Sequence, residues 1–85
     1  MKNNNNFNKE QVEVMALFGY EMTPCQPLSF KRYGEASEVE VTELLKTQIR
    51  FVGATAVHIF EVLVGHEHFR LEFNSLKLTW HLSKI

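Results

Sequence analysis

Apolar and polar residues alternate along the last part of the chain with a period of two, which is the pattern of a half-buried β-strand. Two dipeptides, Gly65-His66 and Asn74-Ser75, interrupt this alternation. Both have the composition of two-residue hairpin turns, because glycine and asparagine tolerate a positive φ. The pattern therefore predicts three antiparallel strands joined by two tight turns.

The two turns fix which side chains face each other across the strands. A turn at Gly65-His66 places Phe60 opposite Leu71, and a turn at Asn74-Ser75 places Phe69 opposite Trp80. One face of the predicted meander is then almost wholly apolar. His58 falls on this face opposite Phe73, where a histidine is expected at the margin of the core.

The opposite face of the same meander carries charged pairs. The register sets Glu61 beside Arg70 and Glu72 beside Lys77. Cross-strand pairs of opposite charge stabilise a sheet, and a slip of one residue would move these charges into the core. The charges and the apolar residues therefore predict the same register.

Two segments before the meander have the spacing of helices. Asn8 with Gln11 forms a capping box for a helix over about 8–18, and Ser37 with Glu40 forms a second one. The second segment, over about 38–52, carries apolar residues at helical spacing and a charged opposite face. The alternative to this helix is a strand through Val39 and Val41.

These elements predict an α+β fold. A short strand over residues 28–33 separates the two helices, which gives the order α-β-α-β-β-β. We expect a two-layer sandwich in which the amphipathic helix at 38–52 covers the apolar face of the C-terminal meander. Residues 1–6 are polar and asparagine-rich and are expected to form a disordered tail, and residues 7–85 a single domain.

Composition narrows the class of protein. The chain has 85 residues, a formal net charge of -1 and one cysteine, Cys25, so it is not a disulfide-rich scaffold. No apolar run reaches the roughly 20 residues of a membrane helix, and the polar N-terminus does not resemble a signal peptide. These features favour a cytoplasmic protein without membrane contact. Cys25 lies between two prolines in a segment expected to be exposed, with no histidine or cation beside it in sequence, which argues against a catalytic thiol.

Three histidines offer a weak metal site. The predicted register places His68 opposite His81 on the outer face, and His66 lies two residues before His68. Imidazoles bind zinc and other transition metals, but structural zinc takes four ligands and no second cysteine is present. We therefore expect solvated surface histidines, and neither a metal nor another cofactor.

Surplus apolar and acidic surface favours a protein partner. The first predicted helix has a second apolar stripe, the outer face of the meander carries aliphatic residues, and the second helix begins with glutamates. The predicted partner-binding residues are Val14, Leu17, Phe18, Ile59, Leu63, Glu38, Glu40 and Glu43. Small domains hide such apolar surface by association, so we expect a homodimer or a tight complex with a partner protein.

The sequence contains no Walker-type loop, HExxH, CxxC or serine elbow, so no enzymatic activity is expected. The function we expect is that of a small inhibitor or adaptor that occupies a partner's surface. A phage or mobile-element origin with an anti-defence role is a hypothesis from size alone. The alternative is a nucleic-acid-binding transcriptional regulator with a modest basic patch, formed by Lys31, Arg32, Lys46 and Arg50.

Overall fold

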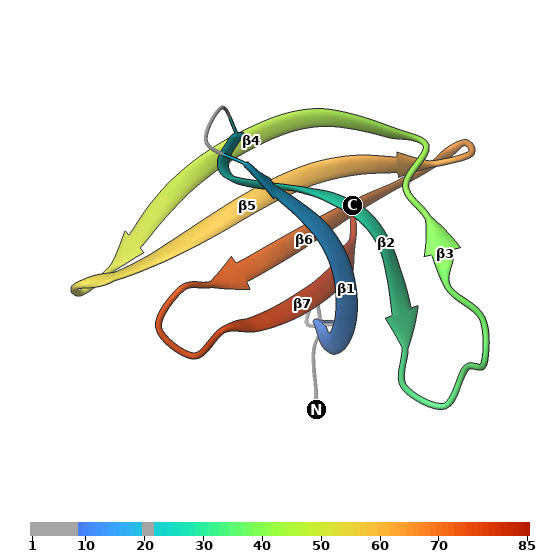
Figure 1. The fold of residues 1–85 in the computed structure, drawn as a ribbon, viewed down its shortest axis with the longest axis horizontal. Helices are drawn as coiled ribbons and strands as arrows, with labels where there is room; N and C mark the ends of the chain where they lie inside the picture. The colour runs from blue at the N-terminus through green and yellow to red at the C-terminus, as the bar shows by residue number, and fades with distance from the viewer. Residues whose placement is uncertain (1–8, 20–21) are drawn as a thin grey trace.

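The computed structural model describes residues 9–19 and 22–85, and this part of the chain forms seven β-strands (Figure 1). The strands are β1 (Glu10–Gly19), β2 (Met22–Arg32), β3 (Val39–Glu40), β4 (Glu43–Val52), β5 (Thr55–Val64), β6 (Glu67–Asn74) and β7 (Thr79–Lys84). The predicted α+β class is therefore wrong, because no described residue is helical. None of the described residues belongs to a helix that could cross a membrane. The expected tail over 1–6 lies outside the described residues.

All seven strands belong to one antiparallel sheet in the order β3-β2-β1-β7-β6-β5-β4. The sheet curls into a half-barrel, so that β1 and β2 lie across the layer formed by the later strands (Figure 1). Residues 41 and 42 connect β3 to β4, which are the two outermost strands of the sheet. The Val41 amide donates to the Leu28 carbonyl on β2, and the Thr42 amide donates to the Leu63 carbonyl on β5.

The core fills the concave face of this sheet. Phe60, Val62 and Leu71 are fully buried there. The Trp80 ring packs 5.5 Å from Phe60 and 4.8 Å from Phe73, measured between ring centroids. Aromatic residues from β5, β6 and β7 thus supply much of the burial that holds the half-barrel together.

The register predicted for the β5–β6 hairpin is confirmed. Phe60 pairs with Leu71, Glu61 with Arg70 and His58 with Phe73. His58 lies at the margin of the core as expected, with its ring centroid 6.2 Å from that of Phe73, but its buried Nδ1 atom has no hydrogen-bond partner among the described residues.

The predicted β6–β7 register is wrong by four residues. Phe73 pairs with Trp80 and Glu72 with His81, because the turn spans 75–78 instead of two residues. The Asn74 side-chain oxygen accepts from the amides of Leu76 and Lys77 at 3.0 and 2.9 Å, which stabilises this wider turn. The predicted pairs of Phe69 with Trp80 and of His68 with His81 are therefore absent.

The first predicted helix, 8–18, is strand β1 from residue 10 onward. Val12, Val14 and Ala16 alternate along the strand and pack in or against the core. Met15 and Leu17 lie between them on the other face and are exposed. Apolar residues on both faces of the strand obscured its period of two and resembled a broad helical stripe.

The second predicted helix, 38–52, divides into β3 and β4. The alternative of a strand through Val39 and Val41 holds for Val39 only, because β3 ends at Glu40. A bulge between Leu44 and Lys46 shifts the alternation of β4 by one residue. Two adjacent leucines followed by Ile49 then have helical spacing. The bulge is thus the physical reason for the wrong assignment.

The buried carboxylate of Glu72 links two other parts of the chain on the outer face of the sheet. The Glu72 side chain on β6 is 9% exposed, and its Oε1 atom lies 3.0 Å from Lys9 Nζ and 3.8 Å from Arg50 Nη2. Lys77 occupies the β6–β7 turn, so the predicted Glu72–Lys77 pair is replaced by Lys9, which directly precedes β1, and by Arg50 of β4.

Candidate protein-docking surface

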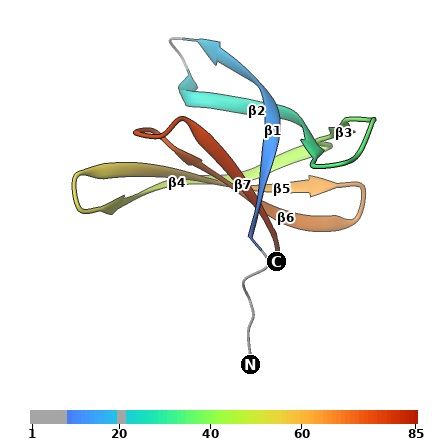
Figure 2. The same cartoon turned by 90° about the horizontal axis from the view of Figure 1, so that it is seen from below.

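The β1–β2 hairpin stands away from the layer formed by β4 to β7 (Figure 2). Three large apolar side chains on its first strand are more than half exposed: Met15 (58%), Leu17 (51%) and Phe18 (61%). Leu28 on β2 is also exposed. We call Met15, Leu17, Phe18 and Leu28 the hairpin surface.

The local pairing explains why these side chains are exposed. Met15 pairs with Ser29 and Ala16 with Pro27, which leaves Leu28 as the extra residue of a bulge on β2. Such a bulge turns a side chain out of the regular alternation of the strand. Val12, Val14 and Ala16 supply the core from one face of β1, and no described residue covers Met15 and Leu17 on the other face. Phe18 follows Leu17 near the end of the strand and is also exposed.

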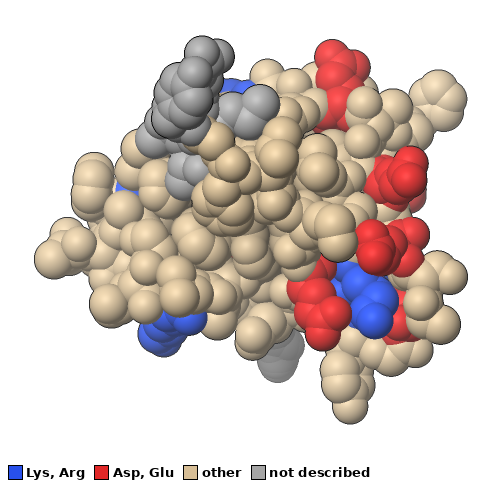
Figure 3. Space-filling view, in the orientation of Figure 1, with Lys and Arg blue, Asp and Glu red and all other residues tan. Residues whose placement is uncertain are grey.

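Acidic residues gather away from the β4–β5 tip. Glu35, Glu38, Glu40 and Glu43 are all exposed, and the Ser29 hydroxyl donates to a Glu38 carboxylate oxygen at 2.7 Å. In Figure 3 the acidic groups lie on the right half of the molecule, whereas its left half shows none. The predicted glutamates therefore form an exposed acidic strip over β3, its flanking residues and the start of β4.

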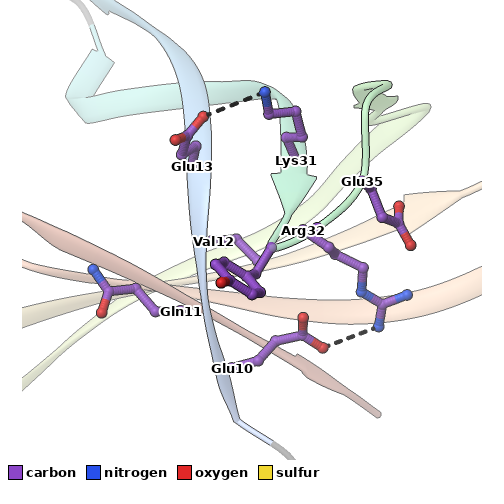
Figure 4. A pocket seen from close by; sticks show the side chains of 9 residues that line it. Glu10, Gln11, Val12, Glu13, Lys31, Arg32 and Glu35 are labelled. Atoms are coloured by element: carbon purple, nitrogen blue, oxygen red, sulfur yellow. Dashed lines mark ion pairs between the residues drawn. The ribbon is translucent and has the colours of Figure 1, made fainter.

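A hollow with a volume of about 620 Å³ lies between β1 and the end of β2 (Figure 4). Its walls carry charges of both signs. Arg32 lies 3.3 Å from Glu10, and Lys31 lies 3.9 Å from Glu13. Each cation has a carboxylate partner, and a third carboxylate, that of Glu35, also lines the hollow, so its walls carry one more negative than positive charge.

The four residues of the predicted basic patch do not form one cluster, and three of them have a carboxylate nearby. Lys31 and Arg32 are paired in this hollow, and Arg50 lies beside the buried Glu72. Lys46 lies on β4, at the opposite end of the sheet order from β2 and β3. Three of these four cations thus lie within 4 Å of a carboxylate oxygen of the same chain.

The candidate metal ligands are not brought together. His81 pairs with Glu72, His66 occupies the β5–β6 turn, and the His68 Nε2 atom lies 3.5 Å from a Glu61 oxygen. Within residues 9–19 and 22–85, no three histidine, cysteine or acidic side chains cluster closely enough to hold a metal ion.

Cys25 is buried in the core, contrary to the exposed loop position predicted for it. Burial raises the pKa of the Cys25 thiol, because the apolar surroundings disfavour the thiolate. A thiol that stays protonated is a poor nucleophile. Cys25 therefore acts as a small apolar residue of the core.

The structure separates the predicted partner-binding residues. Leu17 and Phe18 are exposed, but Val14 and Leu63 are half-buried and Ile59 is only 2% exposed. Sequence reasoning missed Ile49 and Phe51, which are 50% and 68% exposed, because it placed them in a helix. Their alternation with Gln48 and Arg50 was the available signal for a strand.

Comparison of the chain with models of protein families, with curated proteins and with solved structures finds no match.

Proposed function

We propose that this protein is a non-enzymatic protein-binding module that acts as an inhibitor or adaptor by occupying a partner protein's surface. The hairpin surface is the observation that carries this proposal. It concentrates four exposed apolar side chains on a hairpin that projects from the sheet. Apolar surface of this kind is a common feature of interaction sites, where aromatic and aliphatic side chains supply most of the binding free energy.

The electrostatics support a protein partner over nucleic acid. Binding to phosphates needs cations that are free to replace counterions. Lys31, Arg32 and Arg50 each have a carboxylate partner, and the acidic strip would repel a polyanion. We place the protein in the cytoplasm as part of the same proposal, since a single buried thiol is compatible with a reducing compartment.

The test is a pull-down from a lysate of the source cell with the tagged full chain, divided into nuclease-treated and untreated halves. We expect a stoichiometric protein that survives nuclease and rising salt. The double variant Leu17→Ser/Phe18→Ser removes apolar contacts from the hairpin surface and should lose this protein. The matched control is Tyr33→Ser, because Tyr33 is 95% exposed and lies outside the hairpin surface.

Two results would contradict the proposal. Recovery of nucleic acid, with loss of the captured protein after nuclease treatment, would favour a regulator of the nucleic-acid-binding class. Equal capture by the wild type and by Leu17→Ser/Phe18→Ser would show that the hairpin surface is not the docking site.

A further inference from the structure

Strand β4 ends the sheet, and its outer edge is unpaired by any described strand. It is ten residues long, and the β4–β5 hairpin extends beyond the rest of the layer (Figure 2). The outer edge of a strand exposes a row of backbone N–H and C=O groups that can pair with another strand. This part of the molecule is separate from the hairpin surface.

The turn at the end of β4 determines which backbone groups point outward. Gly53-Ala54 is a two-residue turn, and Val52 and Thr55 are its flanking pair. In a hairpin of this type the flanking pair is hydrogen-bonded, and hydrogen-bonded pairs then alternate along an antiparallel ladder. Val52, Arg50 and Gln48 therefore bond to β5, whereas Phe51, Ile49 and Thr47 direct their backbone groups to the free edge.

The residues with outward backbone groups also bring apolar side chains. Ile49 pairs with His58 and Phe51 with Ala56, so both lie on the face of the sheet that holds the core. Together with Leu45 and Val52 they are between 43% and 68% exposed. Leu45 lies in the bulge beyond the segment that could pair, so we estimate that the other three offer roughly 300 Å² of apolar surface, over a third of the ~800 Å² per partner that a stable interface buries. The backbone edge and the polar side chains beside it supply further area.

We propose that a second copy of this chain pairs with β4, antiparallel, about a two-fold axis at Ile49. Each Ile49 then faces Ile49 of the other copy, and each Thr47 faces Phe51. Both kinds of pair join residues whose backbone groups point outward, so the hydrogen bonds of the ladder continue across the axis. Ile49 and Phe51 of the two copies lie on one continuous face and cover each other, whereas Val52 lies on the opposite face of the paired strands.

The charges on β4 decide between the two nearest registers. An axis at Gln48 would place Lys46 directly opposite Arg50 on both sides of the axis, and like charges in that position destabilise a sheet. An axis at Ile49 places Gln48 opposite Arg50 and Lys46 opposite Val52. The bulge between Leu44 and Lys46 lies just beyond this paired segment and leaves it regular.

The test is sedimentation velocity of the full chain over a concentration series. We expect a dimer of twice the chain mass of 9.9 kDa, and a monomer for Ile49→Pro. Proline at this position removes an outward N–H and leaves the hydrogen bonds to β5 in place, so circular dichroism should remain that of the wild type. Leu76→Ser is the matched control, because Leu76 is 72% exposed in the β6–β7 turn, and it should still dimerise.

Oxidative cross-linking tests the register. Paired residues at the axis lie about 5.5 Å apart between Cα atoms, which a disulfide can span. Ile49→Cys should therefore cross-link to a dimer, whereas wild type should not, since Cys25 is buried. A wild type that stays monomeric up to about 100 μM, or a dimer that persists in Ile49→Pro, would overturn the proposal. Faster cross-linking of Gln48→Cys than of Ile49→Cys would overturn the register.

Discussion

The β5–β6 and β4–β5 hairpins share strand β5 and have the same kind of turn, yet they differ in how completely the protein covers them. Each has a two-residue turn that begins with glycine, and the φ angles of Gly65 and Gly53 are 62° and 63°. Strand β6 has β7 on its other side, whereas β4 has no described neighbour beyond β5. Most residues of β6 are buried or half-buried, and all of β4 except Leu44 is exposed.

This difference shows what a turn can and cannot specify. A Gly-first turn joins two antiparallel strands in both places, and it sets the pairing next to the turn. The free energy that holds a strand in the fold comes from the surface it buries. By this argument β6 is a structural strand, whereas β4 has an exposed edge and exposed apolar side chains that contribute little to the stability of the monomer.

The largest expected effect is the difference in stability between a substitution in the core on β5 and one on the exposed strand β4. Phe60→Ala on β5 should lower the free energy of unfolding by about 3–5 kcal/mol, because Phe60 is fully buried and its loss leaves a cavity against Trp80. Phe51→Ala on β4 should change it by no more than roughly 0.5 kcal/mol, since that ring is 68% exposed. Urea denaturation followed by circular dichroism measures both.

These measurements belong at low protein concentration, where association contributes least to stability. If Phe60→Ala is unfolded without urea, the milder Phe60→Leu variant preserves the measurement. A loss at Phe51 as large as that at Phe60 would mean that the concave face of β4 is part of the monomer's core, and the comparison would fail.

A smaller effect concerns the side-chain link between the two hairpins. Glu72 on β6 holds Arg50 of β4 and Lys9, and Glu72→Gln removes the charge with little change of shape. We expect a loss of about 1.5–3 kcal/mol in the free energy of unfolding, the range for a hydrogen bond to a charged group. The two cations are about half exposed, so water can solvate them after the change.

Glu67→Gln is the matched control for Glu72→Gln. Glu67 lies 2.7 Å from Lys84, closer than either contact of Glu72, but both side chains are more than half exposed. Exposed ion pairs contribute little to stability. Equal losses for the two variants would indicate that burial of Glu72 does not strengthen its link to β4.

The sequence predicted the β5–β6 hairpin because several signals agreed there. Phe60, Val62 and Leu71 mark the inner face, Glu61 and Arg70 the outer face, and glycine begins the turn. The same reasoning failed one turn later. Asn74-Ser75 satisfied the composition of a two-residue turn, but the Asn74 side chain instead accepts two amide hydrogen bonds in a four-residue turn.

The other errors have one physical cause. Periodicity in a sequence indicates a strand only where the buried face is apolar and the exposed face is polar, and neither β1 nor β4 meets this condition. β1 has apolar residues on both faces, and β4 is exposed on both faces and shifted by a bulge. Leu17 and Phe18 were identified as interaction residues because their apolarity exceeded what one core face needs. Ile49 and Phe51 were missed because the helical assignment hid their exposure.

The smallest expected effect compares the two turns directly. Alanine at Gly65 or at Gly53 meets no atom within 4 Å, so its cost comes from the positive φ alone. We expect each substitution to lower the free energy of unfolding by about 1–2 kcal/mol, the cost of a left-handed conformation for an L-residue. Urea denaturation followed by circular dichroism measures both, and Ala54→Ser, a small polar change at an exposed position of the same turn, should leave stability unchanged.

Gly53→Ala and Gly65→Ala should lower the free energy of unfolding equally if the sheet unfolds as one cooperative unit. Hydrogen exchange distinguishes the alternative, in which β4 separates from β5 before the rest of the sheet unfolds. In that case Gly53→Ala would accelerate exchange of the Gln48 and Arg50 amides with little change in global stability, whereas Gly65→Ala would still lower it. That result would break the assumption that the two hairpins differ only in burial, and it would identify β4 as a strand that needs a partner to stay in place.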